Sequence, residues 1–124
     1  MRMFIVEVEV NEYGTNKKIK GHILNSRKMK ELGFREEKDS WVYFRELDST
    51  YEISITVKIY KENSDNVNIM VIDDDFGQPY AYQRILMKDA NQKVAKSIWK
   101  KVEAVMLMLT NNQIITGHIM GEYI

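Results

Sequence analysis

Apolar and polar residues alternate most regularly over residues 51–60 of the chain. The apolar positions of this run are Tyr51, Ile53, Ile55, Val57 and Ile59, and the polar positions between them are Glu52, Ser54, Thr56 and Lys58. A period of two places successive side chains on opposite faces of a strand. The pattern therefore predicts a strand with one face against a core and the other toward water.

Three further segments show the same period. They are residues 4–10, residues 41–46 and residues 67–72. Asp48 and Ser49 supply turn residues between the second segment and the strand at 51–60, which predicts an antiparallel meander over residues 41–72. Met70 and Ile72 make the second face of the last strand apolar as well, so this strand is expected to be central or covered on both faces.

Two segments have helical patterns. A long helix is predicted over residues 89–111, where Val94, Ile98, Val102, Val105 and Leu109 recur at steps of three and four residues. Asp89 and Gln92 form an acceptable capping pair at its start. A short helix is predicted after Asn25 or Ser26, with Gly33 marking its end.

These elements predict an α+β fold for a single domain that spans residues 1–124. We expect an antiparallel sheet of about four to five strands, with the long helix packed on one face and a short helix at one end. A chain of 124 residues with 44% apolar residues is long enough for one core and too short for two.

Charge and cysteine content narrow the function classes. Eighteen basic and eighteen acidic residues give a net charge of zero, which weighs against a surface devoted to nucleic acid or anionic lipid. The absence of cysteine excludes disulfides and thiolate chemistry and fits a cytoplasmic setting. Residues 1–10 lack a signal-peptide pattern, and no window is long and apolar enough to predict a membrane span. No cofactor is predicted.

The chain changes from strand to helix between residues 67 and 84. Asp73, Asp74 and Asp75 are expected to end the strand, and Pro79 is expected to begin the first turn of a helix. Aromatic residues and an arginine next to a rigid turn are typical of binding hot spots. We therefore predict a partner-binding surface formed by Phe76, Tyr80, Tyr82 and Arg84. The alternative is that these tyrosines pin the turn to its own sheet.

The aspartate run also allows a metal-dependent enzyme as an alternative. Carboxylate oxygens bind hard divalent cations, and adjacent strand residues point to opposite faces, so only Asp73 and Asp75 are expected to converge. The competing interpretation is a solvated strand end that prevents edge pairing.

A second alternative is nucleic-acid or nucleotide binding through the basic segment 17–30. Its basic residues are Lys17, Lys18, Lys20, Arg27, Lys28 and Lys30. Aromatic residues on the following strand, Trp41, Tyr43 and Phe44, would stack on bases. The chain has no ribonucleoprotein motif, so nucleic acid ranks below a protein partner. His22 and His118, the two histidines of the chain, belong to no catalytic motif and are expected to be structural.

The end of the long helix is apolar on nearly every side. Met106 and Met108 cannot both share the stripe of Val105 and Leu109, and Met-rich surface adapts to many partners. We therefore predict that this end is buried either by a second helix or by a partner chain, in which case Met106 and Met108 form a homodimer interface.

The turn region and the segments around it also carry a family resemblance. The run IDDDFGQPYAYQ, preceded by LGF and the aromatic meander and followed by a helix and the ending GEYI, resembles uncharacterised small proteins of Gram-positive bacteria and their prophages. The resemblance implies a cytoplasmic protein of a mobile element, without an assigned activity or catalytic residues. The function expected from it is that of a non-enzymatic accessory protein that binds a host protein.

Overall fold

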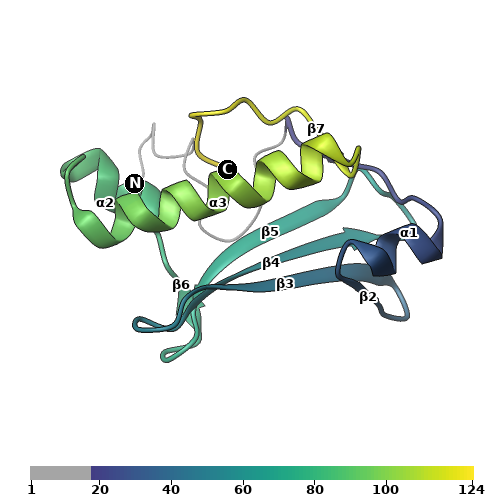
Figure 1. Ribbon diagram of the computed structural model, residues 1–124, viewed down its shortest axis with the longest axis horizontal. Coiled ribbons are helices and arrows are strands. Elements are labelled where there is room, and N and C mark those ends of the chain that lie inside the picture. Colours follow the sequence, from purple (N-terminus) through teal and green to yellow (C-terminus); the bar gives the residue numbers. More distant parts are fainter. Residues whose placement is uncertain (1–17) are drawn as a thin grey trace, which may run out of the picture.

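The computed structural model describes residues 18–124 (Figure 1). The strand predicted over residues 4–10 and the basic residue Lys17 lie outside the described residues.

Five antiparallel strands form the main sheet, in the order β2-β3-β4-β5-β6. Their bounds are Phe34–Glu36, Ser40–Asp48, Ile53–Tyr60, Val67–Asp73 and Gln78–Pro79. The predicted α+β class and the antiparallel meander are therefore confirmed, and β2 and β6 extend the meander at its two edges. β5 lies between β4 and the short β6.

The helix-facing side of the sheet is formed by the alternating residues of β4. Ile53, Ile55, Val57 and Ile59 are all buried. Val57 pairs with Tyr43 on one side and with Ile69 on the other, so the buried rows of three strands are in register. The predicted inclusion of Tyr51 in this row is wrong, because β4 begins at Ile53 and Tyr51 lies in the preceding turn.

The long helix α3, Lys93–Asn111, lies across this face of the sheet (Figure 1). Its buried residues are Ala95, Ile98, Val102, Val105, Met106 and Leu109. The helix ends where the sequence predicted, but its predicted start at Asp89 is wrong. Gln92 is the N-cap, because its side-chain oxygen accepts a hydrogen bond from the Ala95 amide at 2.7 Å.

There are also two short helices among the described residues, one packed next to β2 and one next to α3. The predicted helix α1, Ser26–Glu31, is capped by Asn25 and followed by Gly33 at a φ of 102°. The helix α2, Tyr82–Lys88, is separate from α3. Pro79 does not begin a helix as predicted, because it pairs with Ile72 as part of β6.

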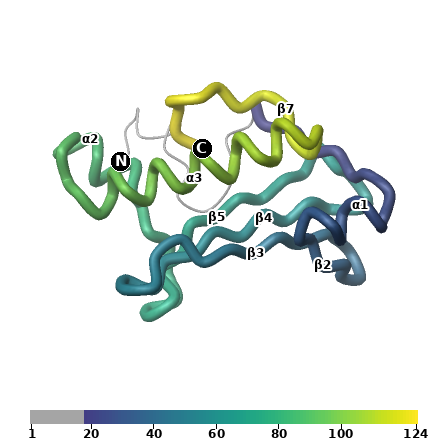
Figure 2. The backbone as a smooth tube through the Cα atoms, in the orientation of Figure 1, coloured from purple at the N-terminus to yellow at the C-terminus, as the bar shows by residue number. Residues whose placement is uncertain are grey.

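A small second sheet joins distant parts of the chain. β1, Lys20–Gly21, pairs with β7, Ile115–Thr116, and the chain then turns back along α3 (Figure 2). At this crossing Gly117 lies so close to Lys18 that a β-carbon would overlap the carbonyl oxygen of Lys18. Within residues 18–124, no helix combines the length and apolar character needed to cross a membrane.

A candidate partner-binding cleft

Two turns meet at one end of the main sheet, between β3 and β4 and between β5 and β6. Asp74 connects them: its amide donates to the carbonyl oxygen of Glu52 at 2.8 Å, and its Oδ1 accepts from the Ser54 hydroxyl at 2.9 Å. Backbone and side chain of one residue thus hold the two turns together. This arrangement is the framework of the candidate site.

Asp73 is the last residue of β5, and Asp74 and Asp75 lie in the turn that follows, where the period of a strand no longer applies. Asp73 and Asp75 line a cleft beside the two turns, whereas Asp74 bonds to Ser54. Asp73 is held in place because its Oδ1 accepts from the Asp75 amide at 3.1 Å and its carbonyl oxygen accepts from the Gly77 amide at 2.8 Å. The turn therefore fixes the carboxylate of Asp73, and Asp75 lines the same cleft.

Aromatic side chains surround the cleft. Tyr51 and Phe76 are 54% and 72% exposed, and Tyr80 between the turns and α2 is half-buried. The complete lining is Thr50, Tyr51, Glu52, Ile53, Asp73, Asp75, Phe76, Tyr80, Ile85, Gln92 and Val94. Large aromatic groups left in water next to an apolar floor are characteristic of contact surfaces.

The charge of the lining has one sign. Its ionised groups are the carboxylates of Glu52, Asp73 and Asp75, and the described lining residues include no lysine, arginine or histidine. Burial raises the pKa of the Tyr80 phenol, and the negative charges of Asp73 and Asp48 raise it further. Of the cleft carboxylates, Asp73 therefore disfavours ionisation of the Tyr80 phenol.

The structure brings together only part of the predicted partner-binding set. Phe76 and Tyr80 line the cleft, and Arg84 is exposed on α2 outside the lining. Tyr82 is fully buried, so it belongs to the core and cannot contact a partner at the surface. Sequence reasoning missed Tyr51 and Glu52, which reach the cleft because the β4–β5 register pairs Ile53 with Asp73.

The basic segment does not form a stacking platform with the predicted aromatics. Its described basic residues, Lys18, Lys20, Arg27, Lys28 and Lys30, are exposed. Trp41 and Tyr43 are buried on the helix-facing side of the sheet, however, and only Phe44 is exposed, on the opposite side. Salt bridges further tie Lys18 to Glu122 and Arg27 to Glu31.

The other predicted sites divide between core and surface. No group of three or more histidine, cysteine, aspartate or glutamate side chains among residues 18–124 is arranged to hold a metal ion. Met106 is fully buried and Met108 packs against the core, so Met106 cannot contribute to a homodimer interface. His22 is exposed beside β1.

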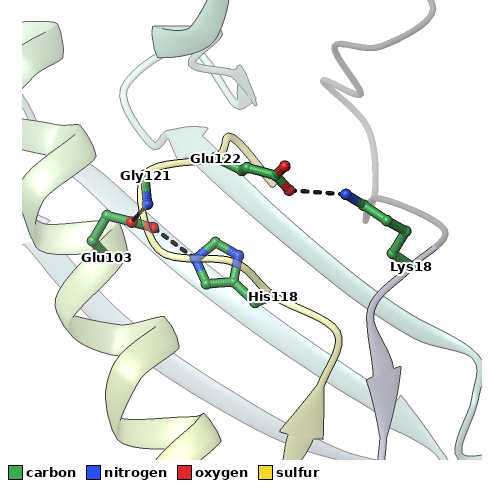
Figure 3. Close-up of polar contacts among 5 residues, drawn as sticks. All are labelled: Lys18, Glu103, His118, Gly121 and Glu122. Carbon is green, nitrogen blue, oxygen red and sulfur yellow. Dashed lines mark hydrogen bonds and ion pairs between the residues drawn. The ribbon is translucent and has the colours of Figure 1, made fainter.

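His118 belongs to a polar clasp that holds the C-terminal segment on α3 (Figure 3). Its Nε2 lies 2.8 Å from Oε2 of Glu103, and its side chain is only 2% exposed. The other oxygen of Glu103 accepts from the Gly121 amide. Two residues further on, the Tyr123 ring makes edge contacts with Tyr82 and Trp99 at centroid distances of 5.8 and 5.2 Å. The predicted structural role of His118 fits this geometry.

Comparisons of the chain with protein-family models, with curated proteins and with solved structures found no match.

Proposed function

We propose that this chain is a non-enzymatic accessory protein that binds a host protein partner through the cleft between the two turns. The observation that carries the proposal is the exposure of Tyr51 and Phe76 beside half-buried Tyr80. Aromatic side chains dominate the binding energy of protein interfaces, especially where they surround an apolar floor. Here Ile53, Ile85 and Val94 provide that floor.

The hydrogen bonds that hold the two turns support the same proposal. Asp74 joins the two turns, and the Tyr80 amide donates to the carbonyl oxygen of Val71 at 2.9 Å. Groups that are fixed before binding lose less conformational entropy on association. The phage or prophage origin of the protein rests on the sequence resemblance alone and is part of the proposal.

The proposal is tested by affinity capture from a Gram-positive host lysate, with and without nuclease, followed by mass spectrometry. The tagged wild type is compared with a Tyr51→Ala/Phe76→Ala variant and with Phe44→Ala. Phe44 is 58% exposed on the opposite face of the sheet, so it controls for the loss of an exposed ring.

A host protein retained by the wild type and by Phe44→Ala in both nuclease arms, but lost with the double variant, supports the proposal. Equal retention by all three proteins contradicts it. Retention only without nuclease favours the nucleic-acid alternative through the basic segment.

A further inference from the structure

Resting on the proposed function, we propose that the partner segment bound by the cleft is basic, and that an arginine side chain of the partner enters between the aromatic rim and the carboxylates of Asp73 and Asp75. Both kinds of group line the same cleft. A guanidinium stacks on aromatic rings and also forms paired hydrogen bonds with a carboxylate. The lining thus offers the two kinds of contact that arginine combines.

The cleft carboxylates have no cationic partner within the described part of the chain. Among residues 18–124, no lysine, arginine or histidine forms an ion pair with Glu52, Asp73 or Asp75. Nearby Asp48 differs, because its Oδ2 lies 4.0 Å from the Lys101 ammonium. Within residues 18–124, therefore, no ion pair neutralises the negative charge of the cleft.

The surroundings of the carboxylates strengthen such an interaction. A concave site with apolar walls concentrates the field of its charges more than a flat surface in water does. Ile53, Ile85 and Val94 form the apolar floor of the cleft here, and Asp73 is held by the backbone of its own turn. An entering guanidinium would meet an Asp73 carboxylate that is already oriented.

The test is a ¹⁵N NMR titration of the full chain with an acetylated and amidated peptide that alternates glycine and arginine. The matched probe replaces each arginine with citrulline, which keeps the shape and removes the charge. We expect the arginine peptide to shift the amide signals of Tyr51, Phe76 and Tyr80. The citrulline peptide is expected to bind at least about tenfold more weakly.

Two charge variants distinguish binding at the cleft from general electrostatic attraction of the peptide to acidic residues anywhere on the surface. Asp73→Asn/Asp75→Asn is expected to weaken arginine-peptide binding about tenfold. Glu62→Gln/Asp65→Asn removes the same charge at the opposite end of the sheet, and its affinity for the peptide is expected to stay within about twofold of that of the wild type. Asparagine at position 73 keeps an oxygen that accepts from the amide of residue 75. Phe76→Leu, which keeps an apolar side chain on an exposed turn, is expected to weaken binding through loss of the ring.

Three outcomes overturn the inference: no binding of the arginine peptide at millimolar concentration, equal binding of the citrulline peptide, or equal weakening by the two charge variants. These outcomes are distinct from failure of the proposed function. If host-protein capture is lost with Tyr51→Ala/Phe76→Ala but unchanged with Asp73→Asn/Asp75→Asn, the cleft binds a partner and the basic character of that partner is refuted.

Discussion

The crossing of the chain at Gly117 allows a stability prediction with an internal control. Gly117 and Gly121 have nearly the same φ, 92° and 93°. A β-carbon at Gly117 would overlap the carbonyl oxygen of Lys18, whereas one at Gly121 would meet no heavy atom within 4 Å. Gly117→Ala and Gly121→Ala therefore share the backbone cost of alanine at positive φ and differ in the steric overlap.

The magnitudes follow from these two contributions. An L-residue in left-handed backbone geometry costs about 1–2 kcal/mol, which is the loss expected for Gly121→Ala. Overpacking adds about 1–3 kcal/mol, and it is poorly relieved here because the obstructing atom belongs to the backbone. Gly117→Ala is thus expected to lose about 2–5 kcal/mol in total. Each kcal/mol corresponds to a decrease in Tm of roughly 3–6 °C for a domain of this size.

The assay is guanidinium unfolding followed by the fluorescence of the two tryptophans, with thermal unfolding as a second measurement. If the two variants have similar m-values, the difference between their losses of stability gives the contribution of the steric overlap at Gly117. Equal losses of stability in Gly117→Ala and Gly121→Ala would refute the close packing of residues 18 and 117.

Three further predictions concern the clasp, the core and the end of α3. Glu103→Gln keeps an oxygen for the Gly121 amide but removes the charge facing His118. We expect the free energy of unfolding, measured with urea, to fall by about 1–2 kcal/mol. An unchanged value would show that the clasp does not contribute to stability. Burial raises the pKa of the Tyr82 phenol above its ordinary value of 10.0, so the unfolded chain ionises first and stability falls as pH rises above about 10. Unfolding measured from about pH 9 to 11 should show a smaller fall for Tyr82→Phe, and an equal fall would contradict this assignment. Met106→Glu places a charge in the core and is expected to lower stability by more than about 3 kcal/mol in thermal unfolding. Leu107→Glu, at an exposed position, is expected to change stability by no more than about 0.5 kcal/mol. Similar losses of stability in both variants would place Met106 at the surface.

The elements that could be predicted from the sequence are those whose side chains have two clearly different environments. β4 has a buried and a more exposed row, so its alternation identifies the strand and the face toward the helix. α3 has one buried stripe and a solvated side, and its predicted end at Asn111 is correct. The Asn25 cap of α1 is likewise a local signal, because the side chain bonds to the Lys28 amide three residues later.

The incorrect assignment of Tyr82 concerns a residue whose neighbours come from a distant part of the chain. The local pattern predicts Tyr82 at a binding surface, but the aromatic ring of Tyr123 packs against it and nothing near residue 82 signals that contact. The cleft has the same origin. Strand register brings Tyr51 and Phe76 to the same cleft, and the sequence alone leaves this register undetermined, so only the Phe76 side of the cleft could be predicted.

The pairing of β1 with β7 has a consequence for the order of folding. The strands β3, β4 and β5 are joined by short turns, so their hydrogen bonds need only local loop closure, which is fast. β1 and β7 join Lys20 to Thr116 and close a loop that contains the whole main sheet. We therefore expect the meander to form early in folding, and this outer pairing late. In the native protein, amide hydrogens of β1 and β7 should exchange through local opening while those of β4 are exposed only by global unfolding. The cleft between the two turns includes Ile53 of β4 and Asp73 of β5, so this part of its framework lies on strands that we expect to exchange slowly.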